Sequence, residues 1–303
     1  MEYRSLSDYL KAEYGEKIYK LSLQTGCTCP NRDGTKGSGG CIFCSEGGSG
    51  DFAAKLRPID EQIEEAKKRV ESKMGKRKDG RPARYIAYFQ SFTNTYGDTD
   101  RLLALFEEAL RRPDIVGLSI GTRPDCITEE MLAGLAELNR QKPVWVELGL
   151  QTIHEETARL IHRCYELSVF EETYSRLKKA GLTVIVHLIL GLPGETEEMM
   201  LQSVDYLAKL NPPLDGVKLQ LLHILKGTKL EDYYREQPFH VLTLKEYTEL
   251  IVQCLRHLPE NIVIHRLTGD GPKKLLIEPQ WSADKKRVLN TIANAVKEAE
   301  RTV

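Results

Sequence analysis

Segments typical of β-strands alternate with segments typical of α-helices along most of this 303-residue chain. The candidate strands span residues 17–23, 85–91, 115–122, 144–150, 182–190 and 216–223. Helical patterns lie between them, at 58–75, 99–111, 128–140, 154–163, 168–180 and 195–210. Strands that are each followed by a helix form a parallel sheet with right-handed crossovers. The sequence therefore predicts an α/β fold, a partial (βα)6 barrel of the TIM type.

The C-terminal part of the chain continues these patterns without a visible linker. Residues 242–258 and 281–301 have helical periodicity, and residues 262–267 are typical of a strand. Ser282 is the expected N-cap of the last helix, and Ser168 with Glu171 has the spacing of a capping box. We expect residues 1–230 to form the partial barrel and residues 231–303 to form an α/β extension packed on it.

A glycine-rich loop directly after the first strand contains four of the seven cysteines, Cys27, Cys29, Cys41 and Cys44. Cys41 and Cys44 have the spacing that lets two sulfurs of one turn face one point, so we expect a metal centre in loop 26–48. Three thiolates would hold a [4Fe-4S] cluster with one open iron, whereas four would suit a structural zinc ion. The odd number of cysteines argues against disulfides. The spacing alone leaves both metals open.

Polar residues gather at the predicted C-terminal ends of the strands, where βα barrels place their active sites. No Gly-x-Gly-x-x-Gly follows the first strand, which argues against a dinucleotide-binding unit. A single polar residue at a strand end is more often structural than functional. Five such ends beside the cysteine loop favour a site. The residues are Gln90, Arg123, Gln151, His187, Lys218, Gln220, His223 and the turn 191–195.

Longer motifs resemble those of radical S-adenosylmethionine (SAM) enzymes. Cys29-x11-Cys41-x2-Cys44 resembles their cluster loop, in the branch related to the catalytic subunit of Elongator. Within that branch the chain is most similar to the YtqA/MnmL type, over about residues 3 to 300. This resemblance favours iron–sulfur over zinc. The motifs that carry it are Cys29-Pro-Asn-Arg-Asp-Gly-Thr35, Thr122-Arg-Pro-Asp125, Gly149-Leu-Gln151, Gly191-Leu-Pro-Gly-Glu195, Leu222-His-Ile-Leu-Lys-Gly-Thr228 and His265-Arg-Leu-Thr-Gly-Asp-Gly-Pro272.

The resemblance implies a [4Fe-4S] cluster held by three cysteines, with SAM bound to the open iron. One electron from the cluster then cleaves SAM to methionine and a 5'-deoxyadenosyl radical, and the protein holds that radical against one C–H bond. The implied cluster ligands are Cys29, Cys41 and Cys44. The expected polar contacts to SAM are Gln90, Arg123 and Gln151, and the turn that contains Gly191, Gly194 and Glu195 is expected to support the adenine.

The role implied by the resemblance is modification of the tRNA wobble uridine, from 5-carboxymethylaminomethyluridine, or its 2-thio form, to 5-aminomethyluridine. The expected partners are tRNA and a one-electron reductant such as flavodoxin or ferredoxin. A substrate carboxylate needs a cation, and the reaction needs a group that moves protons. The candidates are Lys218, Lys226, His187, His223 and Arg266. The alternatives are a radical SAM enzyme for another RNA or a small metabolite, and a non-catalytic iron–sulfur or zinc protein.

The chain departs from the pattern of related enzymes in two places. His162-Arg-Cys-Tyr165 stands where they usually have Asn-Arg-x-His, which bears on the identity of the substrate. Cys27 stands where an aromatic or aliphatic residue is expected, and we interpret it as a buried thiol. Cys126, Cys164 and Cys254 are interpreted as packing residues in the same way.

The charges of the chain nearly balance, with 43 Lys and Arg against 44 Asp and Glu and a net charge of -1. No apolar run approaches the ~20 residues of a membrane span, so we expect a soluble, cytoplasmic protein. Two basic clusters are the candidates for contacts with RNA phosphates. One lies within residues 73–84, and the other combines Lys273 and Lys274 with residues 285–287.

Overall fold

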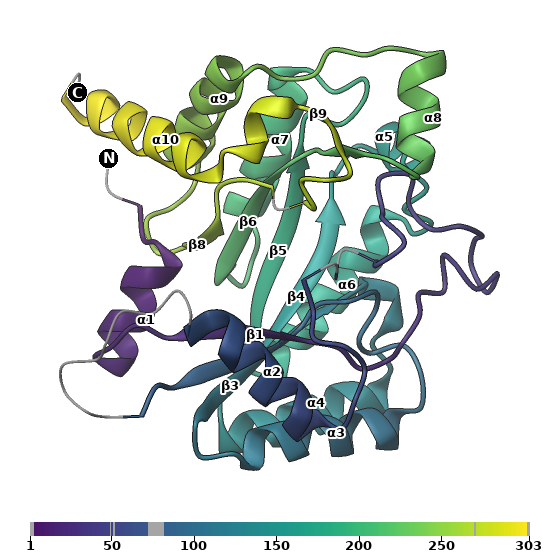
Figure 1. Ribbon diagram of the computed structural model, residues 1–303, viewed down its shortest axis with the longest axis vertical. Helices are drawn as coiled ribbons and strands as arrows, with labels where there is room; N and C mark the ends of the chain where they lie inside the picture. Colours follow the sequence, from purple (N-terminus) through teal and green to yellow (C-terminus); the bar gives the residue numbers. More distant parts are fainter. Residues whose placement is uncertain (1–2, 49, 51, 72–81, 270, 302–303) are drawn as a thin grey trace.

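The computed structural model describes residues 3–48, 50, 52–71, 82–269 and 271–301. Its centre is a parallel sheet of seven strands in the order β1-β2-β3-β4-β5-β6-β8, curled into a half-barrel (Figure 1). The prediction of a partial barrel is confirmed, with one strand more than expected. The strands are β1 (Tyr19–Leu23), β2 (Tyr85–Phe89), β3 (Ile115–Thr122), β4 (Val144–Gln151), β5 (Thr183–Leu190), β6 (Gly216–Leu221) and β8 (Val263–Arg266).

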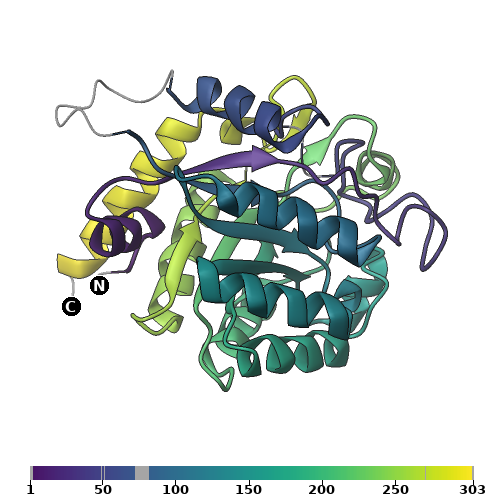
Figure 2. The same ribbon diagram turned by 90° about the horizontal axis from the view of Figure 1, so that it is seen from below.

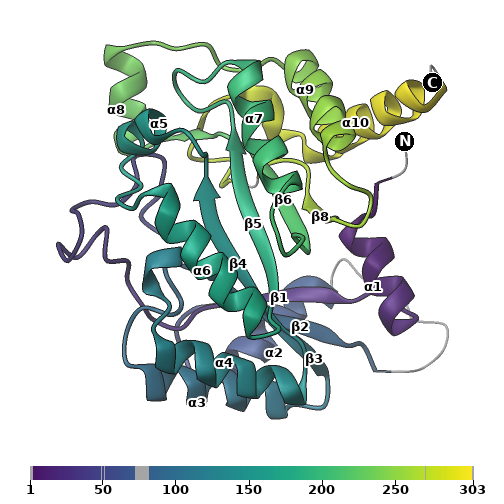
Figure 3. The ribbon, with the colours of Figure 1, turned by 180° about the vertical axis from the view of Figure 1, so that it is seen from behind.

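Helices cover the outer face of this sheet. Figure 3 shows several of them in front of the strands, and Figure 2 shows the curl of the sheet from below. The main core fills the space between the sheet and these helices and includes Leu21, Phe89 and Phe106. The rings of Phe89 and Phe106 meet edge to face. The helices of this layer are α2 (Ile59–Glu71), α3 (Thr99–Arg111), α4 (Glu129–Gln141), α6 (Leu167–Lys179), α7 (Glu197–Ala208) and α9 (Leu244–His257).

The C-terminal segment contributes to the sheet as well as packing on it. β8 pairs in parallel with β6, and the backbone N–H of Ile264 donates to the Arg4 carbonyl beside α1 (Leu6–Tyr14). The expected strand 216–223 is interrupted after Leu221, and a short strand β7 (Ile224–Leu225) pairs instead with β9 (Leu276–Glu278). The remaining elements are α5 (Glu155–Leu160), α8 (Lys229–Glu236), α10 (Lys285–Arg301) and the 3-10 turns Pro124–Cys126 and Gln280–Ala283.

Both expected caps that involve serine are wrong. Helix α6 already begins at Leu167, because the Glu155 carboxylate of α5 accepts its first backbone N–H at 2.6 Å, so Ser168 lies inside the helix. Ser282 lies in the 3-10 turn and donates to the Pro279 carbonyl. Asp284 accepts the Arg287 N–H at the start of α10 instead. A contact from another helix therefore accompanies the start of α6, and a local cap by Asp284, three residues before Arg287, accompanies the start of α10.

Within the described part of the chain, no helix combines the length and the apolar character that a membrane span requires.

Candidate active site

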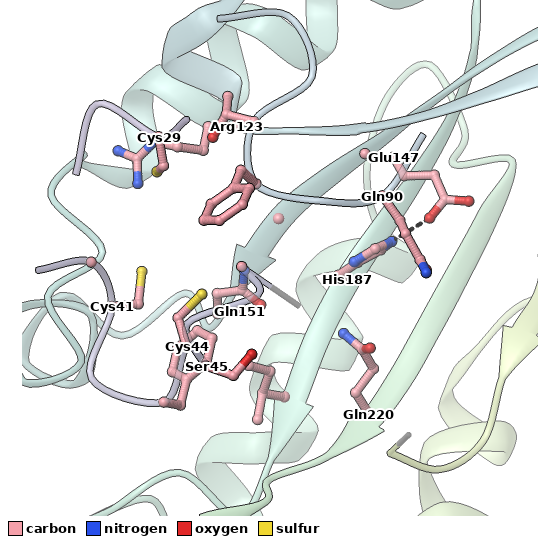
Figure 4. Close-up of a pocket in the computed structure, with 18 of the residues that line it drawn as sticks. Cys29, Cys41, Cys44, Ser45, Gln90, Arg123, Glu147, Gln151, His187 and Gln220 are labelled. Carbon is pink, nitrogen blue, oxygen red and sulfur yellow. Dashed lines mark hydrogen bonds and ion pairs between the residues drawn. The ribbon is translucent and has the colours of Figure 1, made fainter. Parts of the chain in front are cut away.

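A cavity of about 240 Å³ opens at the C-terminal ends of the strands, between the cysteine loop and the loop before β9. Its lining comes from the cysteine loop, from strands β2 to β6 and from the segment 266–271. Figure 4 shows the cysteines along one side of this cavity and Glu147, His187 and Gln220 on the other. The cavity therefore has two chemically different ends, a thiol end and an inner, polar end.

Three of the four clustered cysteines, Cys29, Cys41 and Cys44, line the thiol end. Their sulfur atoms point into a common space (Figure 4). Cys27 does not line the cavity; its sulfur accepts a hydrogen bond from Arg101 at 3.5 Å, and the side chain packs against the main core. The structure thus separates Cys27 from the three cysteines that we expect to be the ligands.

Short hydrogen bonds within the cysteine loop shape it around this space. The Cys44 N–H donates to the Cys41 carbonyl at 3.0 Å, and the Gly40 N–H donates to the Asn31 carbonyl at 2.7 Å. Gly40 has a φ of +82°, and a Cβ there would lie 2.9 Å from the Arg32 guanidinium. Arg32 in turn donates to the Cys44 carbonyl at 3.1 Å. A side chain at position 40 would disturb the wall that carries two of the thiols.

Neighbouring elements fix the loop from outside. The Ile42 N–H donates to the Ile161 carbonyl after α5, and the Leu230 N–H of α8 donates to the Ile42 carbonyl. Asn31 donates its side-chain amide to the His162 carbonyl and to the Cys41 sulfur, the latter at 3.5 Å. Helix α8 was not expected from the sequence, and it holds the loop at the mouth of the barrel.

The segment His162–Tyr165, which departs from the related motif, forms the wall beside the thiols. His162 and Cys164 both have positive φ, +54° and +59°, conformations that side chains other than glycine seldom adopt. Arg163 anchors the segment: it is fully buried and donates to the carbonyls of Leu150 and Thr152. Cys164 is exposed, so its interpretation as a packing residue is wrong.

The wall presents Tyr165 to the cavity. Its hydroxyl donates to the Gly149 carbonyl of β4, and its ring lies under the guanidinium groups of both Arg123 and Arg163. Arg123 also lines the cavity, but it is bound on two sides, to the Asp125 carboxylate and to the Arg163 carbonyl, each at 2.9 Å. Tyr165 therefore occupies a position set by two buried arginines.

Gln151 is the residue best placed for a polar ligand near the thiols. It ends β4 with a φ of +71°, and its Oε1 atom is buried with no hydrogen-bond partner among the described residues. A buried acceptor without a donor is unfavourable by about 1–3 kcal/mol, so a ligand that donates there would be stabilised. Gly149 makes room for this side chain, because a Cβ at that position would lie 2.7 Å from Gln151 Nε2.

The other expected SAM contacts divide into two groups. Gln90 and Arg123 line the cavity, whereas Gly191, Gly194 and Glu195 do not. Glu195 accepts a hydrogen bond from the Thr152 hydroxyl, directly after Gln151, and burial raises the pKa of its carboxyl. The turn therefore supports the end of β4 from behind, and its role toward adenine stays a prediction.

The inner end of the cavity is built around the Glu147 carboxylate of β4. Its Oε1 accepts hydrogen bonds from Lys20 at 2.7 Å and from Ser119 at 2.5 Å. Its Oε2 accepts from His187 at 2.7 Å and from Lys218. Burial alone would raise the pKa of Glu147, but Lys20, Lys218 and His187 outweigh burial and hold that pKa well below its usual range.

The basic groups around Glu147 have lowered pKa values. Burial lowers the pKa of Lys218 to about 7, against the opposing effect of Glu147. Burial and the charge of Lys218 lower the pKa of His187 to about 4. Lys218 also donates to the Tyr88 hydroxyl at 3.0 Å, and burial raises the pKa of that phenol. At neutral pH His187 is therefore an uncharged imidazole beside an ionised carboxylate.

The expected catalytic candidates lie at different depths. His187, His223 and Arg266 line the cavity; Lys218 is buried behind Glu147, and Lys226 is exposed outside it. The loop at Gly269 packs on His223, since a Cβ at Gly269 would lie 2.6 Å from its ring. Sequence reasoning assigned no chemical role to Glu147 or Lys20. The sequence did contain a sign of their importance, because each is a charged residue inside a segment typical of a strand.

The two basic clusters have different outcomes. Most of the first, residues 73–81, lies outside the described residues. Its last member, Arg84, makes an ion pair of 2.5 Å with Glu16 and donates to the Tyr14 carbonyl. Lys273, Lys274 and residues 285–287 are exposed, and Lys273 follows the cavity residue Gly271 by two positions. Lys273 and Lys274 therefore lie near the cavity along the chain, whereas residues 285–287 are in α10.

Comparison with known proteins adds three findings. The model described as the radical SAM superfamily matches residues 24–207, and a radical SAM C-terminal domain model matches 214–298. YtqA of Bacillus subtilis is 43% identical over 96% of this chain and 88% of its own length. A tRNA uridine(34) acetyltransferase of Methanocaldococcus infernus is 28% identical over 65% of this chain and 38% of its own length.

Among solved structures, the archaeal Elp3 of Methanocaldococcus infernus superimposes with a TM-score of 0.67 at 19% identity. The match covers 94% of this chain and 63% of that one. It supports the curled half-barrel and the way in which the C-terminal segment continues it.

Proposed function

Since this chain belongs to the radical SAM superfamily, we propose that it modifies tRNA, converting wobble 5-carboxymethylaminomethyluridine, or its 2-thio form, to 5-aminomethyluridine. One observation carries the proposal: a single cavity has three cysteine thiols at one end and a cluster of basic groups at the other. Relatives named as tRNA uridine(34) acetyltransferases and Elongator complex protein 3 support a tRNA uridine as substrate.

The residues at the thiol end fit a [4Fe-4S] cluster and SAM. Cys29, Cys41 and Cys44 offer the thiolates that such clusters use, and Gln151 Oε1 is a buried acceptor without a donor. Gln151, with Gln90, would contact SAM. When bound, the cluster and SAM supply a 5'-deoxyadenosyl radical that removes one hydrogen atom from the substrate.

The proposed substrate loses two electrons in all. The methylene between amine and carboxylate gives up one hydrogen atom, then one electron to a one-electron acceptor and one proton to a base, which leaves an imine. Water adds to the imine, the C–N bond breaks, and the products are glyoxylate and the primary amine of 5-aminomethyluridine. The physiological electron source would be a one-electron carrier such as flavodoxin or ferredoxin.

The inner end of the cavity supplies the proton chemistry. His187 is neutral at pH 7, with a pKa of about 4, and its Nε2 lies 2.7 Å from Glu147. Lys218, with a pKa of about 7, bonds the same carboxylate. His187 lines the cavity, so it is the group that can contact substrate, and Glu147 orients it. His223 lines the cavity beside the loop at Gly269 and is the second candidate.

Mass spectrometry of tRNA nucleosides tests the proposed function. Cells that lack this protein should accumulate 5-carboxymethylaminomethyluridine, or its 2-thio form, and should lose the 5-aminomethyl derivatives. A gene carrying Cys41→Ala should fail to restore the normal nucleosides, whereas the parent gene should restore them. An unchanged nucleoside profile would contradict the proposal and favour another RNA or a small metabolite.

A further inference from the structure

The end of strand β4 has an unusual backbone. Between the pairs Gly149–His187 and Gln151–Leu188, β4 has one residue more than β5, so Leu150 is the extra residue of a β-bulge. Gln151 follows the bulge with a φ of +71°, a conformation that side chains other than glycine seldom adopt. Such a backbone persists only where neighbouring groups hold it. Contacts from outside the strand must therefore keep Gln151 in place.

The hydroxyl of Tyr165 provides one of these contacts. It donates a hydrogen bond to the Gly149 carbonyl, directly before the bulge. Burial raises the pKa of this phenol, so the hydroxyl keeps its proton and remains a donor at neutral pH. A Cβ at Gly149 would lie 2.7 Å from Gln151 Nε2, so the side-chain amide of Gln151 lies close to the same residue. Gly149 is therefore the point at which Tyr165 meets the Gln151 side chain.

Arg163 provides the other contacts. Its guanidinium donates to the Leu150 carbonyl at 3.2 Å and to the Thr152 carbonyl at 2.7 Å, so the residues before and after Gln151 are both bound. Arg163 is itself fully buried. Two side chains that lie two residues apart in the chain, those of Arg163 and Tyr165, thus bind backbone carbonyls on both sides of Gln151.

The same segment of the chain, residues 161–165, is also fixed to the cysteine loop. The Ile42 N–H donates to the Ile161 carbonyl at 3.1 Å, and Asn31 donates its side-chain amide to the His162 carbonyl. The segment therefore links the loop that carries the thiols to the end of β4, and it sets where the two lie relative to each other.

We propose that Tyr165 is a positioning residue for SAM: by binding the Gly149 carbonyl, its hydroxyl holds the Gln151 side chain toward the thiol end of the cavity. The inference rests on the part of the proposed function that assigns Gln151 to SAM. Tyr165 lines the cavity, but its hydroxyl is bound within the protein, so it acts through Gln151 and not on the reacting atoms. Removal of this hydroxyl should therefore weaken SAM binding only while Gln151 is present.

Equilibrium dialysis of labelled SAM against four reconstituted proteins tests this role. They are the parent, Tyr165→Phe, Gln151→Ala and the double variant, each with its cluster. Tyr165→Phe removes one oxygen and leaves the ring beneath the guanidinium groups of Arg123 and Arg163, so the protein should fold and keep its iron. It should bind SAM about three- to tenfold more weakly than the parent, as expected for one lost hydrogen bond. In the Gln151→Ala background the same change should have no further effect.

Two further variants accompany this comparison. Tyr174→Phe is the matched control, because Tyr174 also donates its hydroxyl to a backbone carbonyl, that of Pro212 at 2.7 Å, but belongs to the main core. It should keep the SAM affinity of the parent. Gly149→Ala reaches the same contact by another route, since its Cβ would displace the Gln151 amide, and it should weaken SAM binding as well. This variant tests the inference even if Tyr165→Phe does not fold.

The outcomes separate this inference from the proposed function. Weaker binding by Gln151→Ala with parental affinity in Tyr165→Phe, or in Gly149→Ala if Tyr165→Phe does not fold, would overturn the positioning role alone. An equal loss from Tyr165→Phe with and without Gln151 would mean that Tyr165 contacts SAM itself, which also overturns it. Parental affinity in Gln151→Ala would refute both the positioning role and the SAM contact assigned under the proposed function. The tRNA substrate is tested separately, by the nucleoside profile.

Discussion

The His187 Nε2 atom lies 2.7 Å from Glu147 Oε2, and the same carboxylate also holds Lys20 and Lys218. Because Ser119 of β3 donates to it as well, five strands meet at one buried anion. Replacing Glu147 with glutamine would leave two lysines without their counter-charge, so we expect the free energy of unfolding to fall by about 3–5 kcal/mol. Urea denaturation measures this change.

The matched control for Glu147→Gln is Glu137→Gln, which removes an exposed carboxylate paired with Arg140. That change should alter stability by no more than about 0.5 kcal/mol. The double variant Glu147→Gln with Lys218→Met should recover part of the loss, because it removes one of the uncompensated cations. A loss below about 1 kcal/mol in Glu147→Gln would contradict the central place of this carboxylate.

The lowered pKa of His187 predicts a specific pH dependence of the free energy of unfolding. Its pKa is lowered from 6.5 to about 4 in the folded protein, so the unfolded chain binds a proton first as the pH falls. The stabilisation is present above pH 6.5 and is lost as the pH falls toward 4. Between pH 7 and 5 the parent protein should lose about 2 kcal/mol more than His187→Gln does. Urea midpoints that shift equally in both proteins would exclude this coupling.

The cysteines make the clearest prediction for the thiol end. After anaerobic reconstitution, Cys29→Ala, Cys41→Ala and Cys44→Ala should each lose the iron and the visible absorption of the cluster. Cys27→Ala is the matched control, because Cys27 lies outside the cavity beside Arg101, and it should keep both. Iron analysis decides. Loss of iron in Cys27→Ala with retention in Cys29→Ala would reverse the assignment of the first ligand.

A second variant at this end separates SAM binding from the cluster. Gln151→Ala should leave the iron content unchanged and weaken SAM binding by about tenfold, the effect of losing one hydrogen bond to a buried acceptor. Equilibrium dialysis with labelled SAM measures it. Unchanged affinity would mean that Gln151 Oε1 has another role.

The exposed basic residues of the second cluster should contact RNA phosphates. Neutralising Lys273 and Lys274, or residues 285–287, should raise the tRNA dissociation constant for every isoacceptor alike. It should also lower the log–log salt slope by roughly one unit per lost contact. Arg140→Gln, on the far end of α4, should change neither quantity. Unchanged affinity and salt slope in all these variants would mean that the residues are solvated and do not contact RNA.

Long, strongly patterned elements could be predicted from the sequence. Strand β3 (Ile115–Thr122) and helix α3 (Thr99–Arg111) match their expected bounds because each carries an unbroken apolar period. The cysteine loop was equally visible, since its signal is local spacing. The start of helix α6 could not be predicted from local patterns. It depends on the hydrogen bond from the Leu167 N–H to Glu155, which is a contact between two helices.

The polar side chains that gather around Glu147 could not be predicted in the same way. Lys20 and Glu147 are 127 residues apart, and only the curl of the sheet brings them within 2.7 Å. A charge inside a predicted strand does not say whether it faces the barrel interior or an outer helix. β8 is only four residues long, too short for periodicity to reveal that it joins the main sheet and brings Arg266 to the cavity.

The most direct test of the proposed function follows one hydrogen atom. Reconstituted protein, SAM and a one-electron reductant are incubated with tRNA whose carboxymethylaminomethyl group is deuterated at the methylene beside the carboxylate. We predict equal amounts of 5-aminomethyluridine, glyoxylate and 5'-deoxyadenosine, with one deuterium in 5'-deoxyadenosine and the other in glyoxylate. Cleavage of SAM that leaves the tRNA unchanged, or 5'-deoxyadenosine without deuterium, would contradict it.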